Sequence, residues 1–182
     1  MGVALHVLRR FPAILTAWLL LFASYASAQD RFQVLHEFTG ETDPGGINSL
    51  LQTTDGSIYG TTYAGGTYAE GTLFRLTPNG SFDVLHSFPP ASYRNVLHFQ
   101  GRDGSVYGSN YDGDGTIFRV TSDGAVSVFA TGVQPEYLVE SMDGNFYGLA
   151  YFPLRGLCFF KVAGDGTVTV LHQFVDDSDG GL

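Results

Sequence analysis

The stretch Asp55-Gly56-Ser57-Ile58-Tyr59-Gly60 returns as Asp103-Gly104-Ser105-Val106-Tyr107-Gly108 and again as Asp143-Gly144-Asn145-Phe146-Tyr147-Gly148. An Asp-Gly pair between two extended runs is a strong hairpin signal, because a tight turn matched to strand twist needs residues that tolerate positive φ. Each copy therefore predicts a turn followed by a strand. The recurrence indicates a tandem-repeat protein, in which each unit buries apolar surface mainly against its neighbours.

Side chains alternate between the two faces of a strand, so the two tyrosines of each copy share one face. Tyr59 and Tyr63 form one such pair, and the later copies repeat it. The glycine after the first tyrosine lies on the opposite face, at Gly60, Gly108 and Gly148. Because glycine has no side chain, we expect a neighbouring sheet to approach closely at these positions.

Further segments recur in the same frame, with a period of 44 and then 42 residues between Gly80, Gly124 and Gly166. Each period offers four short strand candidates and no long helical periodicity. In the first period they are residues 32–38, 47–52, 57–63 and 72–77. Four strands in roughly 40 to 50 residues are typical of a propeller blade. A solenoid is the alternative, but a β-helix coil is usually shorter, and the spacings of leucine-rich repeats are absent.

The repeats predict an all-β fold, a β-propeller-like array of four-stranded blades. Roughly, they span residues 32–80, 81–124 and 125–166, with a partial copy at 167–182. We expect about three blades plus a spare strand at Val168 to Phe174, and an incomplete ring, since closed propellers have about four to eight blades. Three strands of the last copy are missing, which suggests a fragment of a longer array or, alternatively, a domain completed by association.

Residues 1–28 are typical of a secretory signal peptide. Arg9 and Arg10 form the basic start, residues 11–22 are almost wholly apolar, and Ala26-Ser27-Ala28 is a small-residue cleavage site. An apolar run of about a dozen residues is shorter than the roughly 20 needed to span a bilayer, which favours cleavage after Ala28 over a membrane anchor. We therefore expect a secreted or cell-surface protein with no membrane span after cleavage.

The mature chain is strongly acidic. Without Arg9 and Arg10 it keeps 7 basic residues against 18 acidic ones, a net charge of −11 with neutral histidines. An acidic surface argues against nucleic acid and anionic membrane as partners. The acids are spread over turns, so a solvated surface explains them. Cys158 is the only cysteine, which excludes an internal disulfide, and its apolar neighbours indicate a buried strand thiol.

Three recurring motifs resemble the GloVer tandem-repeat family: Tyr-Gly-Thr-Thr at 59–62, Gly-Thr-Leu-Phe at 71–74, and Val-Leu-His-x-Phe at 34–38, 84–88 and 170–174. The resemblance covers Phe32 to Leu182. It implies an exported bacterial protein with a propeller-like array, often followed in that family by a C-terminal anchoring domain, and it implies no catalytic residue. The third period departs from the pattern, with Ala130 and Gly132 where the others have His and Phe.

Histidines occupy two kinds of position. His36, His86 and His172 share one repeat position, and a residue repeated along an array is more often structural than catalytic. His98 differs, because it aligns with leucines, Leu50 and Leu138, in the other periods. A polar group at an apolar repeat position marks either a site or an exposed blade edge, so His98 is a candidate site residue.

Three acidic residues complete the candidates: Asp112, Asp114 and Glu140. Asp112 and Asp114 form an acidic cluster, as do residues 176–179, but neither cluster fits a calcium loop with a distant Glu, and turn chemistry explains both. Glu140 aligns with Gln52 and Gln100, which makes it a polar repeat position first. No phosphate loop, Ser/His/Asp order or Cys/His pair stands out, so we expect no metal and no cofactor.

Two classes of function fit these observations. The first is a non-enzymatic extracellular or cell-surface repeat module that binds an extracellular macromolecule or glycan, or serves as surface structure. The second is a secreted propeller-type glycan hydrolase or lyase, which would gather His98, Asp112 and Glu140 into one pocket with two carboxyl groups about 5 to 10 Å apart. Unpaired strand edges at Phe32 to Phe38 and Val168 to Phe174 also predict marginal stability and self-association.

Overall fold

The computed structural model describes residues 34–37, 46–152 and 156–175. The chain divides into two compact units, Met1–Leu35 and His36–Leu182, and every described strand belongs to the second unit. Among the described residues, no helix is long and apolar enough to cross a membrane. The signal peptide predicted for residues 1–28 lies outside the described residues and stays a prediction.

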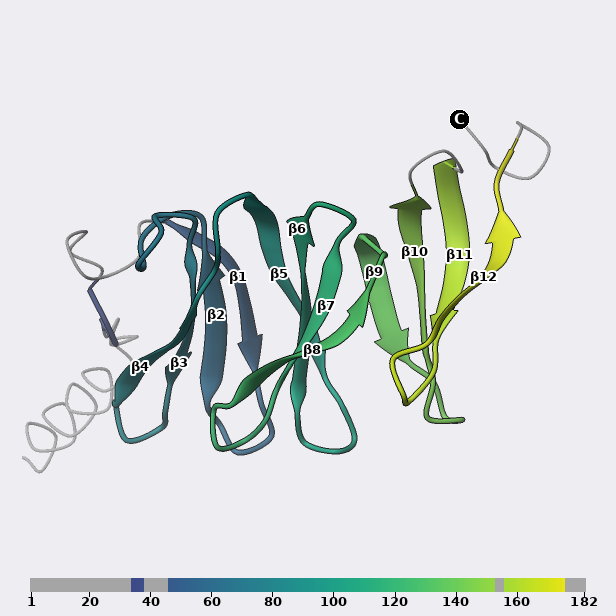
Figure 1. Ribbon diagram of the computed structural model, residues 1–182. Coiled ribbons are helices and arrows are strands. Elements are labelled where there is room, and N and C mark those ends of the chain that lie inside the picture. The colour runs from purple at the N-terminus through teal and green to yellow at the C-terminus, as the bar shows by residue number, and fades with distance from the viewer. Residues whose placement is uncertain (1–33, 38–45, 153–155, 176–182) are drawn as a thin grey trace, which may run out of the picture. The chain divides into compact units, whose positions relative to one another are not determined.

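The described strands form three four-stranded antiparallel sheets, in each of which every strand pairs with the next along the chain (Figure 1). The first sheet contains β1 (Ile47–Gln52), β2 (Ile58–Thr62), β3 (Thr72–Leu76) and β4 (Phe82–Ser87). The second contains β5 (Ser92–Gln100), β6 (Val106–Asp112), β7 (Thr116–Val120) and β8 (Val126–Thr131). The third contains β9 (Pro135–Glu140), β10 (Phe146–Phe152), β11 (Gly156–Val162) and β12 (Val168–Gln173). The expected array of four-stranded blades is confirmed, and the sheets do not close into a ring.

The third sheet is complete because β12 pairs with β11. The prediction that Val168 to Phe174 is a spare strand is therefore wrong. The predicted repeat boundaries after residues 80, 124 and 166 lie in turns between the third and fourth strands, so one sheet takes its last strand from the next sequence repeat. Of the related segment Phe32 to Phe38, only residues 34–37 are described, and they form no strand.

Six turns of one kind join the strands at one end of the sheets, which we call the turn end. In the first, the Thr53 amide donates to the Ser57 carbonyl and the Gly56 amide donates to the Thr53 carbonyl, both at 2.9 Å. Gly56 has a φ of +85°, a conformation that glycine adopts readily. The same pair of hydrogen bonds recurs in the turns that begin at Thr77, Gly101, Thr121, Ser141 and Ala163. The predicted Asp-Gly hairpin turns are therefore confirmed.

Each sheet packs against its neighbours through alternate side chains. The core between the first and second sheets includes Tyr59, Leu73, Phe88, Val106 and Phe118. The core between the second and third sheets includes Tyr107, Ile117, Phe146, Phe160 and Val162. One face of β6 therefore packs towards the first sheet and the other towards the third, as the alternation of side chains along a strand requires.

Gly60, Gly108 and Gly148 have a different role from the predicted one. Each pairs with a phenylalanine on the next strand of its own sheet. A Cβ at Gly60 would clash with the Phe74 ring, and one at Gly148 would lie 2.8 Å from the Phe160 ring. The expected close approach of a neighbouring sheet is wrong, because the space belongs to an aromatic ring of the same sheet.

Candidate functional site

The four candidate residues lie in different places. His98 is within β5, Asp112 ends β6, Asp114 is in the turn that follows, and Glu140 ends β9 at the turn end. Asp112 lies at the opposite end of the sheets, which we call the loop end, where its Oδ1 accepts from the Thr116 hydroxyl at 2.8 Å. Within the described ranges, no three His, Cys, Asp or Glu side chains form a group that could hold a metal ion.

A β-bulge in β5 gives His98 a position of its own. Leu97 pairs with Gly108, the place that the alignment assigned to His98, and His98 is the extra residue of the bulge. Although β5 is an edge strand, the imidazole is only partly exposed, and its Nε2 lies 2.8 Å from the Ser109 hydroxyl oxygen. Burial lowers the pKa of His98 to about 4, so the ring is neutral at pH 7.

Glu140 links two neighbouring sheets. Its Oε2 accepts from the Arg102 amide, in a turn of the second sheet, at 2.8 Å. Gln100 makes the equivalent contact one sheet earlier, where its Oε1 accepts from the Thr54 amide at 2.9 Å. An amide oxygen thus does in one sheet what a carboxylate oxygen does in the next, so this contact requires only an acceptor.

The repeated histidines pack against aromatic rings. His86 meets Phe88 edge to face with 5.3 Å between the ring centroids, and His172 meets Phe174 in the same way at 4.8 Å. Equivalent packing at equivalent positions supports the structural interpretation of these residues. Cys158 is buried in β11, as predicted, and its thiol lies 3.7 Å from the Gly156 carbonyl oxygen.

The turn aspartates use their carboxylates to hold the turns. Asp143 Oδ1 accepts from the Asn145 amide at 3.0 Å, and its Oδ2 accepts from the Asn145 side chain and the Tyr147 hydroxyl, both at 2.8 Å. These hydrogen bonds, those of Asn145 first, hold the pKa of Asp143 well below its usual range. Hydrogen bonds from Thr53 and Ser57 likewise lower the pKa of Asp55.

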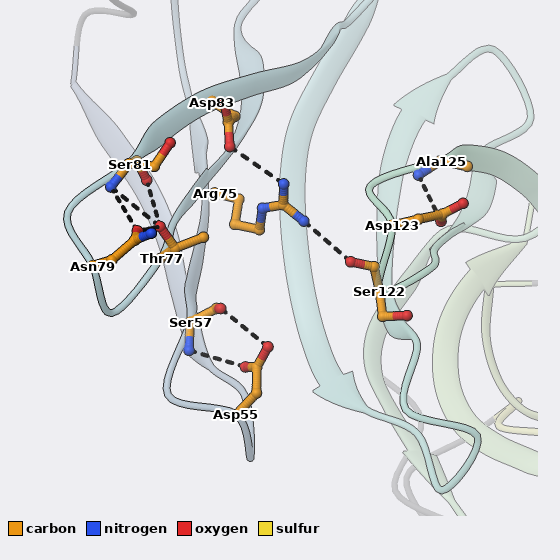
Figure 2. Close-up of polar contacts among 10 residues, drawn as sticks. All are labelled: Asp55, Ser57, Arg75, Thr77, Asn79, Ser81, Asp83, Ser122, Asp123 and Ala125. Atoms are coloured by element: carbon orange, nitrogen blue, oxygen red, sulfur yellow. Dashed lines mark hydrogen bonds and ion pairs between the residues drawn. The ribbon is translucent and has the colours of Figure 1, made fainter.

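An arginine of β3 joins the first sheet to a turn of the second sheet (Figure 2). Arg75 forms an ion pair with Asp83 of its own sheet, with 3.3 Å between Nη2 and Oδ2. Its Nη1 donates at 3.1 Å to the Ser122 carbonyl, in a turn of the second sheet. The polar groups of the turn end therefore hold turns and connect sheets.

A cluster of contacts around Arg94 at the loop end joins the second and third sheets. Both terminal nitrogens of Arg94 contact the Glu136 carboxylate, at 3.1 and 3.2 Å. The Tyr111 hydroxyl donates to the same carboxylate at 2.7 Å, and the Arg94 guanidinium lies 5.1 Å from the centre of the Tyr111 ring. Burial and the hydrogen bond to Glu136 raise the pKa of Tyr111 to about 12. The charge of Arg94 is thus balanced by one carboxylate between the second and third sheets.

A polar network joins the first and second sheets beside this cluster. Asn48 Nδ2 donates to the Asn95 carbonyl at 2.6 Å, and the Thr61 hydroxyl donates to the same oxygen. The Ser49 and Thr61 hydroxyls lie 2.7 Å apart. Asn95 Nδ2 donates to the Glu70 carbonyl at 3.1 Å, which orients the side-chain amide of Asn95.

A cavity of about 240 Å³ lies at the loop end between these two groups of contacts. Its lining comprises Asn48, Thr62, Tyr63, Glu70, Ser92, Tyr93, Arg94 and Asn95. The Ser92 and Asn95 residues are each only 2% exposed, yet Ser92 Oγ and Asn95 Oδ1 have no hydrogen-bond partner in the described part of the chain. Buried polar atoms almost always have a partner, so these two oxygens require an explanation.

A second cavity, of about 380 Å³, lies beside β4, β7 and β8. Its lining includes His86, Asn110, Asp112 and several apolar residues. Each of the two cavities has one carboxylate among its lining residues, Asp112 here and Glu70 in the first. Neither lining therefore provides the two carboxylates that most glycosidases use.

Sequence reasoning missed Ser92, Tyr93, Arg94 and Asn95. That reasoning weighed repeated positions and acidic groups, whereas these residues belong to a segment found in one repeat. The signal was present in the irregular run Phe-Pro-Pro-Ala-Ser-Tyr-Arg-Asn at 88–95, which the other periods lack. An irregular segment inside a regular array is a place to look for function, because the array itself does not require it.

A family model described as the Gloeobacter/Verrucomicrobia repeat matches residues 21–182. A comparison with curated proteins found no match to this chain.

Among solved structures, the chain is similar to the extracellular domain of BT4673, a proposed one-component system from B. thetaiotaomicron. The TM-score is 0.51 at 22% sequence identity, over 74% of this chain and 17% of that one. It is also similar to a proposed gluconolactonase, with a TM-score of 0.48 at 15% identity, over 72% of this chain and 51% of that one. Both neighbours are propeller-type proteins. The likeness to BT4673 supports the propeller-like fold, and this chain spans 17% of the length of that extracellular domain.

Proposed function

The chain belongs to the Gloeobacter/Verrucomicrobia repeat family, and from that premise we propose that it is a non-enzymatic repeat module, secreted or displayed at the cell surface, that binds an extracellular macromolecule or glycan. One observation carries the proposal. The candidate acid Glu140 accepts a turn amide of the preceding sheet, as Gln100 does one sheet earlier. A position at which glutamine makes the same contact is a structural acceptor and not a proton donor.

The competing function is a secreted propeller-type glycan hydrolase or lyase. It would require His98, Asp112 and Glu140 in one cleft, with two carboxyl groups close enough to flank a glycosidic bond. Asp112 and Glu140 lie at opposite ends of the sheets, and His98 contacts Ser109 within its own sheet. These separate positions favour the binding module.

Export is the second part of the proposal. The basic start, apolar run and Ala-Ser-Ala site of residues 1–28 are typical of a cleaved secretory signal. The acidic composition of the remaining chain suits a soluble exported surface. Mass spectrometry of the chain recovered from the medium or the cell surface should give an N-terminus at Gln29.

The non-enzymatic part is tested by incubating the purified chain with neutral and acidic glycans and measuring new reducing ends or unsaturated products. We expect none, and we expect Glu140→Gln and Asp112→Asn to leave this result unchanged. Glycan cleavage that Glu140→Gln abolishes would contradict the proposal. Retention of the uncleaved chain inside the cell would contradict the exported location.

A further inference from the structure

We propose that the loop-end cavity between the first and second sheets is a binding site for a neutral saccharide. The inference rests on the proposed function, because it specifies the ligand class and the site of that binding module. Three features of the cavity carry it: two buried oxygens without partners, two exposed tyrosines, and a cluster of unusual backbone conformations.

The two buried oxygens can accept hydrogen bonds from a ligand that has donor groups. Asn95 Nδ2 is already engaged with the Glu70 carbonyl, so Asn95 Oδ1 is the group left to accept. Ser92 Oγ can both donate and accept. Sugar hydroxyl groups also donate and accept, so one polyhydroxylated ligand can satisfy both oxygens.

The tyrosines supply the apolar half of such a site. Tyr63 and Tyr93 also line the cavity and are 64% and 62% exposed. An exposed aromatic ring offers an apolar face next to water, which suits the C–H face of a sugar ring. Small-molecule sites commonly combine aromatic walls with a few placed polar groups, and this cavity shows both.

The backbone around the cavity is conformationally unusual. Three non-glycine residues of the described chain have positive φ: Ala69 at 60°, Ala91 at 68° and Arg94 at 51°. Ala69 precedes the lining residue Glu70, Ala91 precedes Ser92, and Arg94 itself lines the cavity. Such conformations are uncommon outside glycine and cluster at ligand sites, where the surrounding contacts maintain them.

The charges of the lining favour a neutral ligand. The Arg94 guanidinium is held by both carboxylate oxygens of Glu136, so it does not offer a free cation to a phosphate, sulfate or uronic acid. Glu70 adds a carboxylate to the same lining, which opposes an anionic ligand. The class that remains is a sugar without charged substituents.

The test uses the full purified chain and neutral mono- and disaccharides of glucose, galactose, mannose, xylose and N-acetylglucosamine. Saturation-transfer NMR identifies the sugars that bind, and titration calorimetry measures their affinity. We expect Ser92→Ala and Tyr93→Ala each to weaken binding at least tenfold. Tyr137→Ala, which changes an exposed tyrosine of β9 outside the cavity, is the matched control and should bind as the unchanged chain does.

Thermal unfolding separates binding from a structural role of Ser92. Because the Ser92 hydroxyl has no partner in the described chain, Ser92→Ala should not lower the melting temperature, although it should weaken sugar binding. Binding of none of the sugars, or unchanged affinity in both variants, would overturn the site. Affinity lost only together with folding would also overturn it. Release of products from a bound sugar would instead contradict the non-enzymatic function and leave the site standing.

Discussion

The ring of Phe118 fills the space that a side chain at Gly108 would need, and its Cε2 lies 2.7 Å from a Cβ built on that glycine. The two residues pair across β6 and β7, and the other two sheets repeat the arrangement. An aromatic ring that covers a glycine on the neighbouring strand compensates for the missing side chain and fixes the strand register. The motif Tyr-Gly in each repeat is therefore coupled to a phenylalanine that follows the glycine by 10 to 14 residues, as Gly108 and Gly60 show.

Gly108→Ala should destabilise the protein. The added methyl group would lie 2.6 Å from the Val96 carbonyl oxygen as well as against Phe118, and backbone cannot move as a side-chain end can. Such overpacking costs about 1–3 kcal/mol, or more where the backbone must shift. Gly164→Ala is the control, because a Cβ there meets nothing within 4 Å and φ is not positive. The urea midpoint of unfolding should be lowered in Gly108→Ala only, and equal midpoints for both variants would contradict the prediction.

Gly104→Ala tests the turn conformation without any steric contact. Gly104 has a φ of +79°, and a Cβ there meets nothing within 4 Å. The left-handed conformation costs an alanine about 1–2 kcal/mol, whereas asparagine tolerates it better. We expect thermal unfolding to rank the unchanged chain above Gly104→Asn and Gly104→Asn above Gly104→Ala. A melting temperature of Gly104→Ala at or above that of Gly104→Asn would show that φ at this turn does not limit stability.

The sequence predicts the architecture well because the signals are local and repeated. Asp-Gly pairs between alternating strands specify the turns, and the fixed spacing of the strands specifies four-stranded sheets. It does not predict which sheet the strand Val168–Gln173 joins, because a repeat in sequence can begin at any strand of a repeat in space. Nor does the sequence reveal why position 60 is a glycine, because Phe74 lies against Gly60 only through the pairing of β2 and β3.

The site was harder to predict because its residues are irregular. The bulge that displaces His98 depends on the pairing of β5, which is longer than the corresponding strands β1 and β9. Ser92 and Asn95 are ordinary residues in sequence, and they become notable only because burial leaves two oxygens without partners. Burial and hydrogen-bond completion are properties of the packed array, so repeat analysis alone does not reach them.

Asp143→Asn should reduce the loss of stability in acid. The folded-state pKa of Asp143 lies below the value of about 3.9 expected in the unfolded chain. Its contribution is therefore present above about pH 4 and is lost as the pH falls through the folded-state pKa. Asn79 holds an equivalent turn, where its Oδ1 accepts from the Ser81 amide at 3.2 Å, so asparagine preserves the turn. Melting temperatures between pH 7 and 2 should fall less steeply in the variant, and parallel curves would contradict this.

His98→Gln should reduce the loss of folding stability between about pH 6.5 and pH 4. Burial lowers the pKa of His98 to about 4 in the folded protein, against about 6.5 in an unfolded chain. Between these two pKa values the histidine is protonated in the unfolded chain and neutral in the folded protein. The free energy of unfolding therefore falls as the pH drops from about 6.5 towards 4, by an amount on the order of 3 kcal/mol. Glutamine retains a polar partner for Ser109 but does not titrate in this range. Urea unfolding at pH 7 and pH 4.5 should show a smaller difference for the variant, and an equal difference would assign the acid sensitivity elsewhere.

The outer face of the third sheet exposes apolar positions whose counterparts in the second sheet are buried or partly buried. Phe159 is 36% exposed, whereas its counterpart Ile117 in the second sheet is 0% exposed. Leu171 is 48% exposed, whereas its counterpart Phe129 packs against the core between the second and third sheets. This face therefore has the composition of a surface that another sheet of the same kind covers. The sequence predicts self-association at strand edges. We expect it instead at this outer face, which a second copy of the chain can cover.

Leu171→Lys should weaken self-association without weakening the fold. We expect the unchanged chain to show a mass that rises with concentration in sedimentation velocity, because exposed apolar faces of this kind mark protein contacts. A lysine at position 171 would bring a charge into that contact, while its exposure keeps the effect on melting temperature small, within about 0.5 kcal/mol. Met142→Lys is the matched control, since Met142 is an exposed apolar residue in a turn of the same sheet and away from this face. If the unchanged chain sediments as a monomer at every concentration, or if both variants lower the mass equally, the outer face of the third sheet is not the contact surface.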